Sequence, residues 1–195
     1  MDFEWKGFEL HPSTPRGGMA LSQLFKGRPI GPMHKQLKGF AAGFGVSMRL
    51  GDHLPNTRRA LALAEHARAH GRLHALRDGV MDAHWRDGRD IEADDVLAEL
   101  AQKAGLDPDA ALQAADGPEM GARVDALGRE AQRWGVTGIP TYFLLPDGWT
   151  PGSPPPASGA QPVRIVGCQP YEGVVVGCKR AQIRRRSHDA SPSTD

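Results

Sequence analysis

Gly135-Val-Thr-Gly-Ile-Pro140-Thr-Tyr-Phe-Leu-Leu145 is the stretch of sequence that decides the fold. A Gly-Ile-Pro-Thr turn leads into an apolar run, and that run predicts a strand over 141–145. After a polar interruption, Val163-Arg-Ile-Val166 predicts a second strand, which ends on Gly167-Cys-Gln-Pro170. A further helix follows, so the C-terminal part of the chain is expected to be strand, strand and helix.

The N-terminal part has a different pattern. Residues 2–10 alternate between apolar and charged side chains, which predicts a strand. Proline after His11 ends this strand, because proline cannot donate to a sheet ladder. From residue 19 to 134 apolar residues recur at helical spacing. Helices are expected over 31–44 and over 118–134. Between them, one helix is expected to begin at Asn56 or Thr57 and to break at Gly71, and the next to continue through Trp85. A further helix is expected from Asp90 to a cap at Gly105, and a short one from Asp107.

Composition argues against several classes of protein. The 195 residues are enough for one domain with a large insertion, and a net charge of +1 gives no overall attraction to nucleic acid or anionic membranes. No apolar run approaches the roughly 20 residues that cross a bilayer, and the first residues lack the segments of a secretion signal. Two cysteines are too few for a disulfide framework, which favours the cytoplasm. We therefore expect no nucleic-acid partner and no membrane partner.

Two polar clusters have a simple structural explanation. His66, His70 and His74 are spaced to share one helix face and could bind a transition metal. Gly71 interrupts that helix, and no carboxylate or cysteine completes the set, so a solvated face is favoured and no metal site is expected. The basic residues over 179–186 have no aromatic neighbours, so a solvated end is favoured over contact with nucleic acid.

Seven short motifs occur along the chain in a specific order. They are Trp5-Lys-Gly-Phe-Glu-Leu-His-Pro12, Gly18-Met19, Pro55-Asn-Thr57, Gly88-Arg-Asp-Ile91, Gly105-Leu-Asp107, Gly135-Val-Thr-Gly-Ile-Pro-Thr141 and Gly167-Cys-Gln-Pro170. In order and spacing they resemble the DsbA-like thioredoxin family, and within it the FrnE-like branch. That family is related to 2-hydroxychromene-2-carboxylate isomerases and kappa-class glutathione transferases. The resemblance implies an α/β, thioredoxin-like (DsbA-type) sheet with a large all-helical insertion.

The resemblance also divides the chain into parts. It implies an incomplete thioredoxin-like domain made of 1–18 and 131–183, and a helical insertion domain over 19–130. Composition adds a Pro/Gly-rich loop insertion over 146–162 and a disordered tail over 184–195. The family begins with a strand and a helix that carry Cys-Pro-x-Cys, or serine in the isomerase branch. This chain has no Cys-x-x-Cys, so the first strand of the fold is expected to be missing from it.

In this fold the missing strand would lie between 2–10 and 141–145. Each buried, unpaired backbone group would cost about 1–3 kcal/mol, so the gap needs a resolution. Either the coding start lies upstream and the sequence is truncated, or a partner chain completes the sheet, or 2–10 shifts to pair with 141–145. We expect the first.

Topology and the resemblance together define a candidate site. Pro140 matches the family's cis-proline, which leaves its neighbour's backbone free to pair with an extended substrate. Ile139–Pro140 is therefore expected to be cis, although only about 5% of X-Pro bonds in folded proteins are. Strand ends meet at this edge of the sheet, so the expected substrate-binding residues are His11, Ile139, Pro140, Thr141, Cys168 and Gln169. The loop over 146–162 is expected at the opposite end.

Cys168 is the only thiol expected beside this cleft, and it could form a mixed disulfide. Free cysteine is among the most often buried residue types, so a buried Cys168 in place of a small alanine is favoured, and no catalytic residue is assigned. Cys178 is expected in the core or half-buried on the last helix. A Cys168–Cys178 disulfide is not expected, because it needs Cα atoms within about 7 Å.

Three functions follow from the resemblance. The chain is a thiol–disulfide oxidoreductase by descent, redox-inactive as it stands because it lacks the dithiol. Alternatively, it binds a peptide or glutathione in the Pro140 cleft without catalysis, or it is a glutathione-dependent isomerase or transferase. The expected partners are an extended peptide or small thiol and a second copy that completes the sheet. The resemblance allows glutathione as a cofactor, and no other cofactor is expected.

Overall fold

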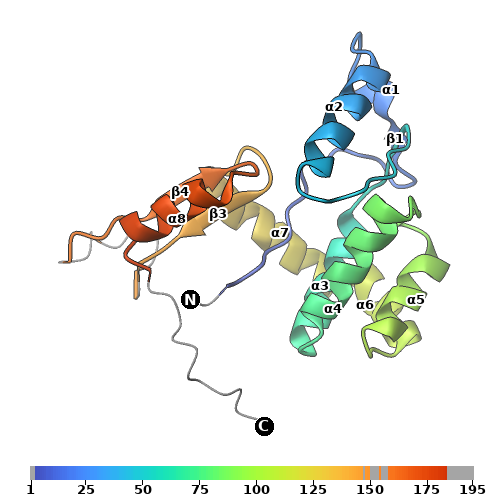
Figure 1. The fold of residues 1–195 in the computed structure, drawn as a ribbon. Helices are drawn as coiled ribbons and strands as arrows, with labels where there is room; N and C mark the ends of the chain where they lie inside the picture. The colour runs from blue at the N-terminus through green and yellow to red at the C-terminus, as the bar shows by residue number, and fades with distance from the viewer. Residues whose placement is uncertain (1–2, 147, 150–153, 155–157, 184–195) are drawn as a thin grey trace. The chain divides into compact units, whose positions relative to one another are not determined.

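The structure is a computed structural model that describes residues 3–146, 148–149, 154 and 158–183 (Figure 1). None of the helices in these residues combines the length and apolar character needed to cross a lipid bilayer. The elements in chain order are β1 (Met19–Ala20), α1 (Leu21–Leu24), α2 (Ile30–Ala42), β2 (His53–Leu54), α3 (Arg58–Ala69), α4 (Leu73–Met81), the π-helical turn η1 (Asp82–Arg86), α5 (Asp94–Lys103), α6 (Pro108–Asp116), α7 (Pro118–Arg133), β3 (Thr141–Leu144), β4 (Val163–Val166) and α8 (Tyr171–Arg180).

The chain forms two compact units. One unit contains Met1–Lys6 and Glu130–Asp195, and the other contains Gly7–Arg129. We call them the C-terminal unit and the helical unit. The boundary falls within the last turn of α7, and residues 7–18, which were expected in the sheet domain, lie in the helical unit.

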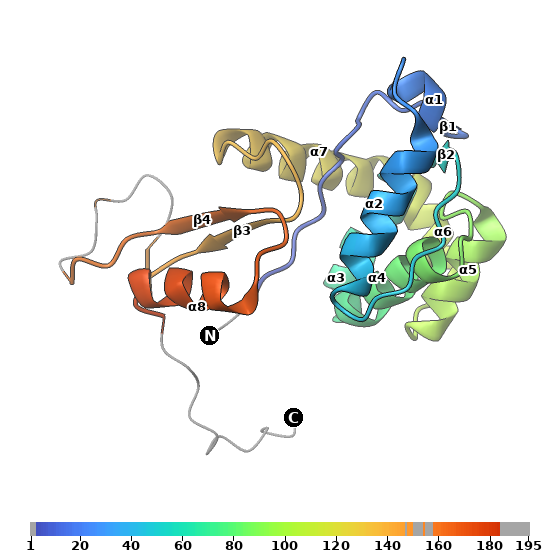
Figure 2. The same ribbon diagram turned by 45° about the horizontal axis from the view of Figure 1, so that its top comes forward.

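The helical unit holds the hydrophobic core. α3 packs against α4, α5 and α6 (Figure 2). Leu63 of α3, Leu76 of α4 and Leu97 of α5 are the largest fully buried side chains. Burial of each leucine side chain contributes about 1.5–3 kcal/mol, so these three residues help to hold this unit together. The alanines of α3 on the same face, among them Ala60 and Ala67, let its neighbours approach closely.

Most helix boundaries follow the predicted signals. Gly71 has φ 68° just after α3, and Gly105 has φ 80° just after α5, the left-handed conformation of a glycine cap. The Asp107 carboxylate accepts a hydrogen bond of 2.8 Å from the N–H of Ala110 at the start of α6. The helix predicted from Asp90 begins only at Asp94, because the Asp90 side chain accepts a hydrogen bond from the N–H of Glu92 and forms a turn instead.

The C-terminal unit contains a two-stranded sheet covered by one helix. β3 and β4 are antiparallel, with Tyr142 opposite Ile165 and Leu144 opposite Val163. Cross-strand partners share a face, and α8 packs on this face at Gly177. A Cβ atom at Gly177 would lie 2.7 Å from Leu144 Cδ1 and 3.1 Å from Ile165 Cδ1. Both predicted strands and the helix that follows are therefore confirmed.

The strand predicted over 2–10 is wrong for residues 3–10, which form neither helix nor strand. A strand needs a neighbour that completes its hydrogen bonds. Within the described residues β3 pairs only with β4, and β1 only with β2. Residues 3–10 therefore have the alternating sequence of a strand but no neighbouring strand among the described residues to hydrogen-bond with. Of the predicted loop insertion, 147, 150–153 and 155–157 lie outside the described residues, as does the whole predicted tail.

Candidate functional site

A glycine cap at the end of α7 directs the chain toward β3. The N–H of Gly135 donates to the Gln132 carbonyl at 3.0 Å, and the N–H of Val136 donates to the Ala131 carbonyl at 2.9 Å. Gly135 has φ 67°, as this kind of cap requires. Arg164 Nη1 on β4 donates to the Gly135 carbonyl at 3.1 Å. The turn after α7 is therefore tied to the sheet.

The Ile139–Pro140 peptide bond is cis, as predicted. The Pro140 carbonyl accepts a hydrogen bond of 2.7 Å from the N–H of Gly167, at the end of β4. Thr141 Oγ1 donates to the Gly138 carbonyl at 2.6 Å and closes the turn on itself. The cis-proline turn is thus held against the end of β4 and continues directly into β3.

Alternate residues of β3 point their backbone groups away from β4. Pro140 pairs with Gly167, and in an antiparallel ladder every second residue is hydrogen-bonded to the neighbouring strand. Tyr142 and Leu144 therefore bond to β4. Thr141, Phe143 and Leu145 turn their N–H and C=O groups outward, and we call these three residues the β3 edge. Among the described residues they have no backbone partner on that side.

Ile139 continues this open edge before the proline. Its side chain is 52% exposed. Its N–H and C=O make no backbone hydrogen bond to any described residue. Sequence reasoning selected Ile139 and Thr141 but missed Phe143 and Leu145. The two-residue period of a strand that starts at Pro140 is the signal that would have identified them.

Cys168 is exposed and free, so its predicted burial is wrong. Gly167, which has φ 77°, follows the last residue of β4 and directly precedes Cys168. Gln169 is also exposed, and its Nε2 donates to the Val166 carbonyl at 3.1 Å. Cys168 and Gln169 therefore come directly after Gly167, whose N–H donates to the Pro140 carbonyl. Cys178 is half-buried on α8, as expected, and it too is free.

His11 lies in the helical unit, whereas the cis-proline turn lies in the C-terminal unit. Its carbonyl accepts a hydrogen bond of 3.0 Å from the N–H of Thr14. The Thr14 carbonyl accepts one of 2.7 Å from Asn56 Nδ2. The Glu92 carboxylate then accepts from the N–H groups of Gly17, at 2.7 Å, and of Asn56, at 3.0 Å. These contacts anchor the loop that follows His11 to the segments just before α3 and α5.

Of the three histidines that sequence spacing placed on one helix face, two are in contact. The rings of His66 and His70 lie side by side at the end of α3, with centroids 4.3 Å apart and planes tilted by 43°, whereas His74 is on α4 beyond Gly71. Burial, and then the neighbouring His70, lower the pKa of His66. Across the part of the chain that the structure describes, no three His, Cys, Asp or Glu side chains make a group that could hold a metal ion.

His84 on η1 is a second perturbed histidine, which sequence reasoning did not select. Burial lowers the pKa of His84, and its ring lies 4.4 Å from the ring of Trp85. Nothing in the local sequence distinguishes this histidine from the others, because its burial depends on the fold. Its lowered pKa makes the stability of the helical unit depend on pH.

Comparison with known proteins gives the class of protein. Residues 1–167 match the family model of the DSBA-like thioredoxin domain. The chain belongs to this family. A solved structure, that of a probable DsbA oxidoreductase from Streptomyces coelicolor, is similar with a TM-score of 0.73 and 24% sequence identity, over 96% of this chain and 78% of that one. The likeness shows an α/β, thioredoxin-like fold with a large helical insertion. No curated protein matches.

Proposed function

We propose that this chain is a FrnE-like member of the DSBA-like family that acts in the cytoplasm. We further propose that the 195-residue chain binds an extended peptide or a small thiol at its cis-proline turn without catalysing dithiol–disulfide exchange. One observation carries the proposal. The turn presents the N–H and C=O groups of Ile139, which make no backbone hydrogen bond to any residue that the structure describes, and an exposed, free Cys168 follows Gly167, the residue that bonds to Pro140.

Binding at Ile139 follows from its free backbone groups. An extended peptide can donate one hydrogen bond to the Ile139 carbonyl and accept one from its N–H, as strand addition does. Each such bond contributes a net of about 0.5–1.5 kcal/mol. The exposed Ile139 side chain adds apolar area for a neighbouring side chain of the peptide. The family resemblance supports this role, since the residue before the cis-proline is the one that pairs with substrate there.

The thiols of this chain support a single covalent step. A Cys168 thiolate can attack a substrate disulfide, forming one mixed disulfide while the other substrate sulfur leaves as a thiolate. Turnover requires a second thiol to attack that mixed disulfide. The other cysteine of the chain, Cys178, is half-buried in α8. We therefore expect Cys168 to trap a disulfide substrate and not to release an oxidised product.

The proposal extends to the coding sequence. The family's dithiol lies in a strand–helix unit with Cys-Pro-x-Cys, and the 195 residues contain no Cys-x-x-Cys. We expect that unit to be encoded in frame upstream of Met1. Serine in place of the first cysteine would favour the isomerase branch, and a stop codon directly upstream would contradict this part of the proposal.

The decisive experiment combines two assays on the 195-residue chain. In insulin reduction with dithiothreitol, the chain should show no turnover above background. With oxidised glutathione, intact-mass spectrometry should show one glutathione on the wild type and on Cys178→Ser, and none on Cys168→Ser. Insulin turnover that disappears in Cys168→Ser would contradict the proposal, because it would show that this thiol completes a catalytic cycle.

A further inference from the structure

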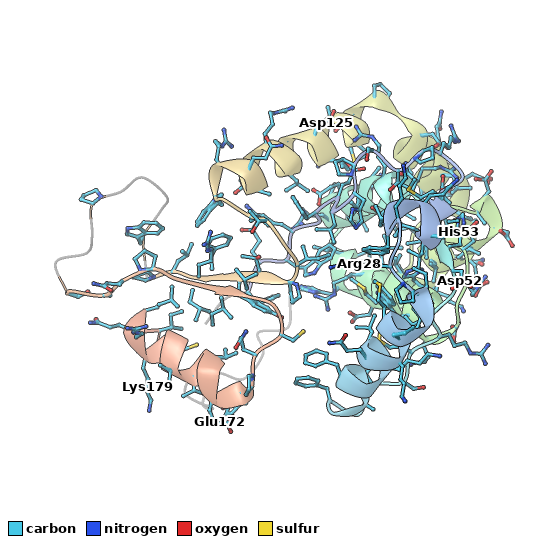
Figure 3. The ribbon with its side chains drawn as sticks, turned by 90° about the horizontal axis from the view of Figure 1, so that it is seen from above. Arg28, Asp52, His53, Asp125, Glu172 and Lys179 are labelled. Carbon is cyan, nitrogen blue, oxygen red and sulfur yellow. The ribbon has the colours of Figure 1, made fainter. Side chains whose placement is uncertain are left out.

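The segment around α2 carries positive charge and no negative charge. From residue 19 to residue 51 the sequence has no Asp or Glu, and its basic residues, all of them exposed, are Lys26, Arg28 (labelled in Figure 3), Lys35, Lys38 and Arg49. We call them the α2 cations. Among the described residues none of them forms an ion pair, whereas Arg58 and Arg59 of α3 each pair with two carboxylates. The α2 cations are therefore available to a negatively charged partner.

α2 also exposes apolar side chains. Leu37 and Phe40 are three residues apart on the helix and so share one face. Phe44 follows just past the end of α2, and its ring meets that of Phe40 edge to face, with centroids 5.2 Å apart. The N–H of Val46 donates to the Ala41 carbonyl at 3.0 Å, which holds Val46 beside the end of the helix. Leu37, Phe40, Phe44 and Val46 are each at least 40% exposed, and we call them the α2 face.

α2 has little packing of its own. Ala41 is its one buried residue, and α2 takes no part in the close packing of α3, α4, α5 and α6. A helix shorter than about 12–15 residues is marginal in water by itself, and α2 has 13. Grouped apolar side chains on a surface mark interaction sites. A partner that covers the α2 face would therefore also stabilise the helix.

We propose that α2 binds the surface of a membrane that contains anionic lipids. A helix that lies on such a surface inserts its apolar face at the boundary of head groups and acyl chains, while its basic residues meet the lipid phosphates. An open pocket beside α2 has this combination on a small scale, because Lys38 lines it together with the apolar side chains of Ala42, Val46 and Met48. Each basic residue close to an anionic surface strengthens binding about fivefold.

Other partners match this surface less well. Two copies paired through their α2 faces would bring Lys35 and Lys38 near the same residues of the other copy, with no carboxylate in the segment to separate them. Nucleic acid would match the α2 cations, but its phosphates gain nothing from Leu37 and Val46. The expectation of no membrane partner rested on the net charge of +1, which does not show how the charges are distributed.

The strand that the family resemblance implies upstream of Met1 belongs to another part of the chain. Its expected place is beside β3, in the C-terminal unit, whereas α2 lies in the helical unit. A chain extended by the segment encoded in frame upstream should therefore bind membranes as tightly as the 195 residues do. Loss of binding in the extended chain would overturn the proposal, because it would show that the upstream segment covers α2.

Vesicle co-sedimentation tests the binding. The 195-residue chain should sediment with vesicles of phosphatidylglycerol and phosphatidylcholine, but not with phosphatidylcholine alone. Salt at about 1 M, where the Debye length is about 3 Å, should weaken the binding at least about tenfold. Lys35→Gln/Lys38→Gln should do the same at low salt. Lys179→Gln/Arg180→Gln is the matched control, because it changes the net charge equally on exposed residues of α8 (Lys179 is labelled in Figure 3), and its effect should be under about twofold.

Three results would overturn the proposal. The first is a folded wild type that stays in the supernatant with anionic vesicles. The second is a control variant that weakens binding as much as the α2 variant does. The third is a chain that binds RNA or polyglutamate but no vesicle, because its partner would then be a soluble polyanion. None of these results bears on the proposed function, which is judged from thiol trapping at Cys168.

A fluorescent probe tests which residues enter the lipid. In a Cys168→Ser/Cys178→Ser background, Phe44→Cys and Lys179→Cys are each labelled with a dye whose emission depends on its surroundings. Anionic vesicles should shift the emission of the dye at residue 44 to the blue and leave that of the dye at residue 179 unchanged. Equal shifts at both positions, or no shift at residue 44, overturn the proposal, because they place the contact away from α2.

Discussion

Gly177→Ala tests how closely α8 packs on the β3–β4 sheet. The added methyl group would lie 2.7 Å from Leu144 Cδ1 and 3.1 Å from Ile165 Cδ1, whereas carbon atoms prefer about 3.5–4.0 Å. Both atoms end flexible side chains, so the packing can yield, but overpacking of this kind costs about 1–3 kcal/mol. The higher helix propensity of alanine returns about 1 kcal/mol. We expect a net loss in the free energy of unfolding of up to about 2 kcal/mol.

Gly173→Ala on the same helix is the matched control. Its added methyl group would have Gln169 Cβ as its nearest neighbour, at 3.7 Å, an ordinary contact. Alanine should therefore stabilise this position by about 0.5–1 kcal/mol. Urea denaturation followed by tryptophan fluorescence is suitable, because the Trp134 ring lies 4.4 Å from that of Phe143 on β3. If both alanines stabilised the chain equally, the close approach of α8 to the sheet would be refuted.

Three further predictions concern the helical unit. Gly18→Ala should destabilise it by more than about 2 kcal/mol, since Gly18 has φ 72° and a methyl group would collide with the His53 ring and the Leu54 carbonyl. Gly17→Ala is the control, because Gly17 has φ 83° but an added methyl group there would meet no atom within 4 Å. The difference in melting temperature between the two variants therefore measures the effect of the collision apart from that of the backbone strain. Arg59→Lys should cost about 1–3 kcal/mol in urea denaturation, because it removes the paired hydrogen bonds to Asp116, both 2.8 Å. The exposed Arg123→Lys should cost under about 0.5 kcal/mol. Because burial lowers the pKa of His84, its unfolded form binds the proton more readily, so the free energy of unfolding should fall from about pH 7.5 to pH 5.5. In His84→Gln, urea titrations over this range should show a smaller fall, and an unchanged slope would contradict the assignment.

The family resemblance and local backbone preferences explain the parts of the fold and of the site that were predictable from sequence. Seven motifs together carried the family resemblance, and the match of Pro140 to the family's cis-proline is the reason why the cis bond was expected. Gly71 and Gly105 identified helix ends because few other residues adopt the left-handed conformation that is needed there. The strands at 141–144 and 163–166 were identified because short apolar runs bounded by turn residues are typical of strands.

The features that were not predictable depend on partners distant in sequence. Cys168 is exposed just beyond β4, and the general tendency of cysteine to be buried does not say how the chain leaves that strand. Residues 3–10 alternate as a strand does, but pattern alone cannot supply the ladder that defines one. The open edge of β3 likewise became visible only when the hydrogen bond between Gly167 and Pro140 set the pairing.

The most direct measurement of the central claim is residue-resolved amide hydrogen exchange at Ile139. In a dilute solution of the chain, Tyr142 and Leu144 should exchange slowly, because they bond to β4, while the Ile139 amide should exchange fast. Adding a peptide whose single cysteine is disulfide-bonded to a small thiol should slow exchange at Ile139. Slow exchange there in the free chain, or no change with the peptide, would contradict the assignment of this turn as the binding site.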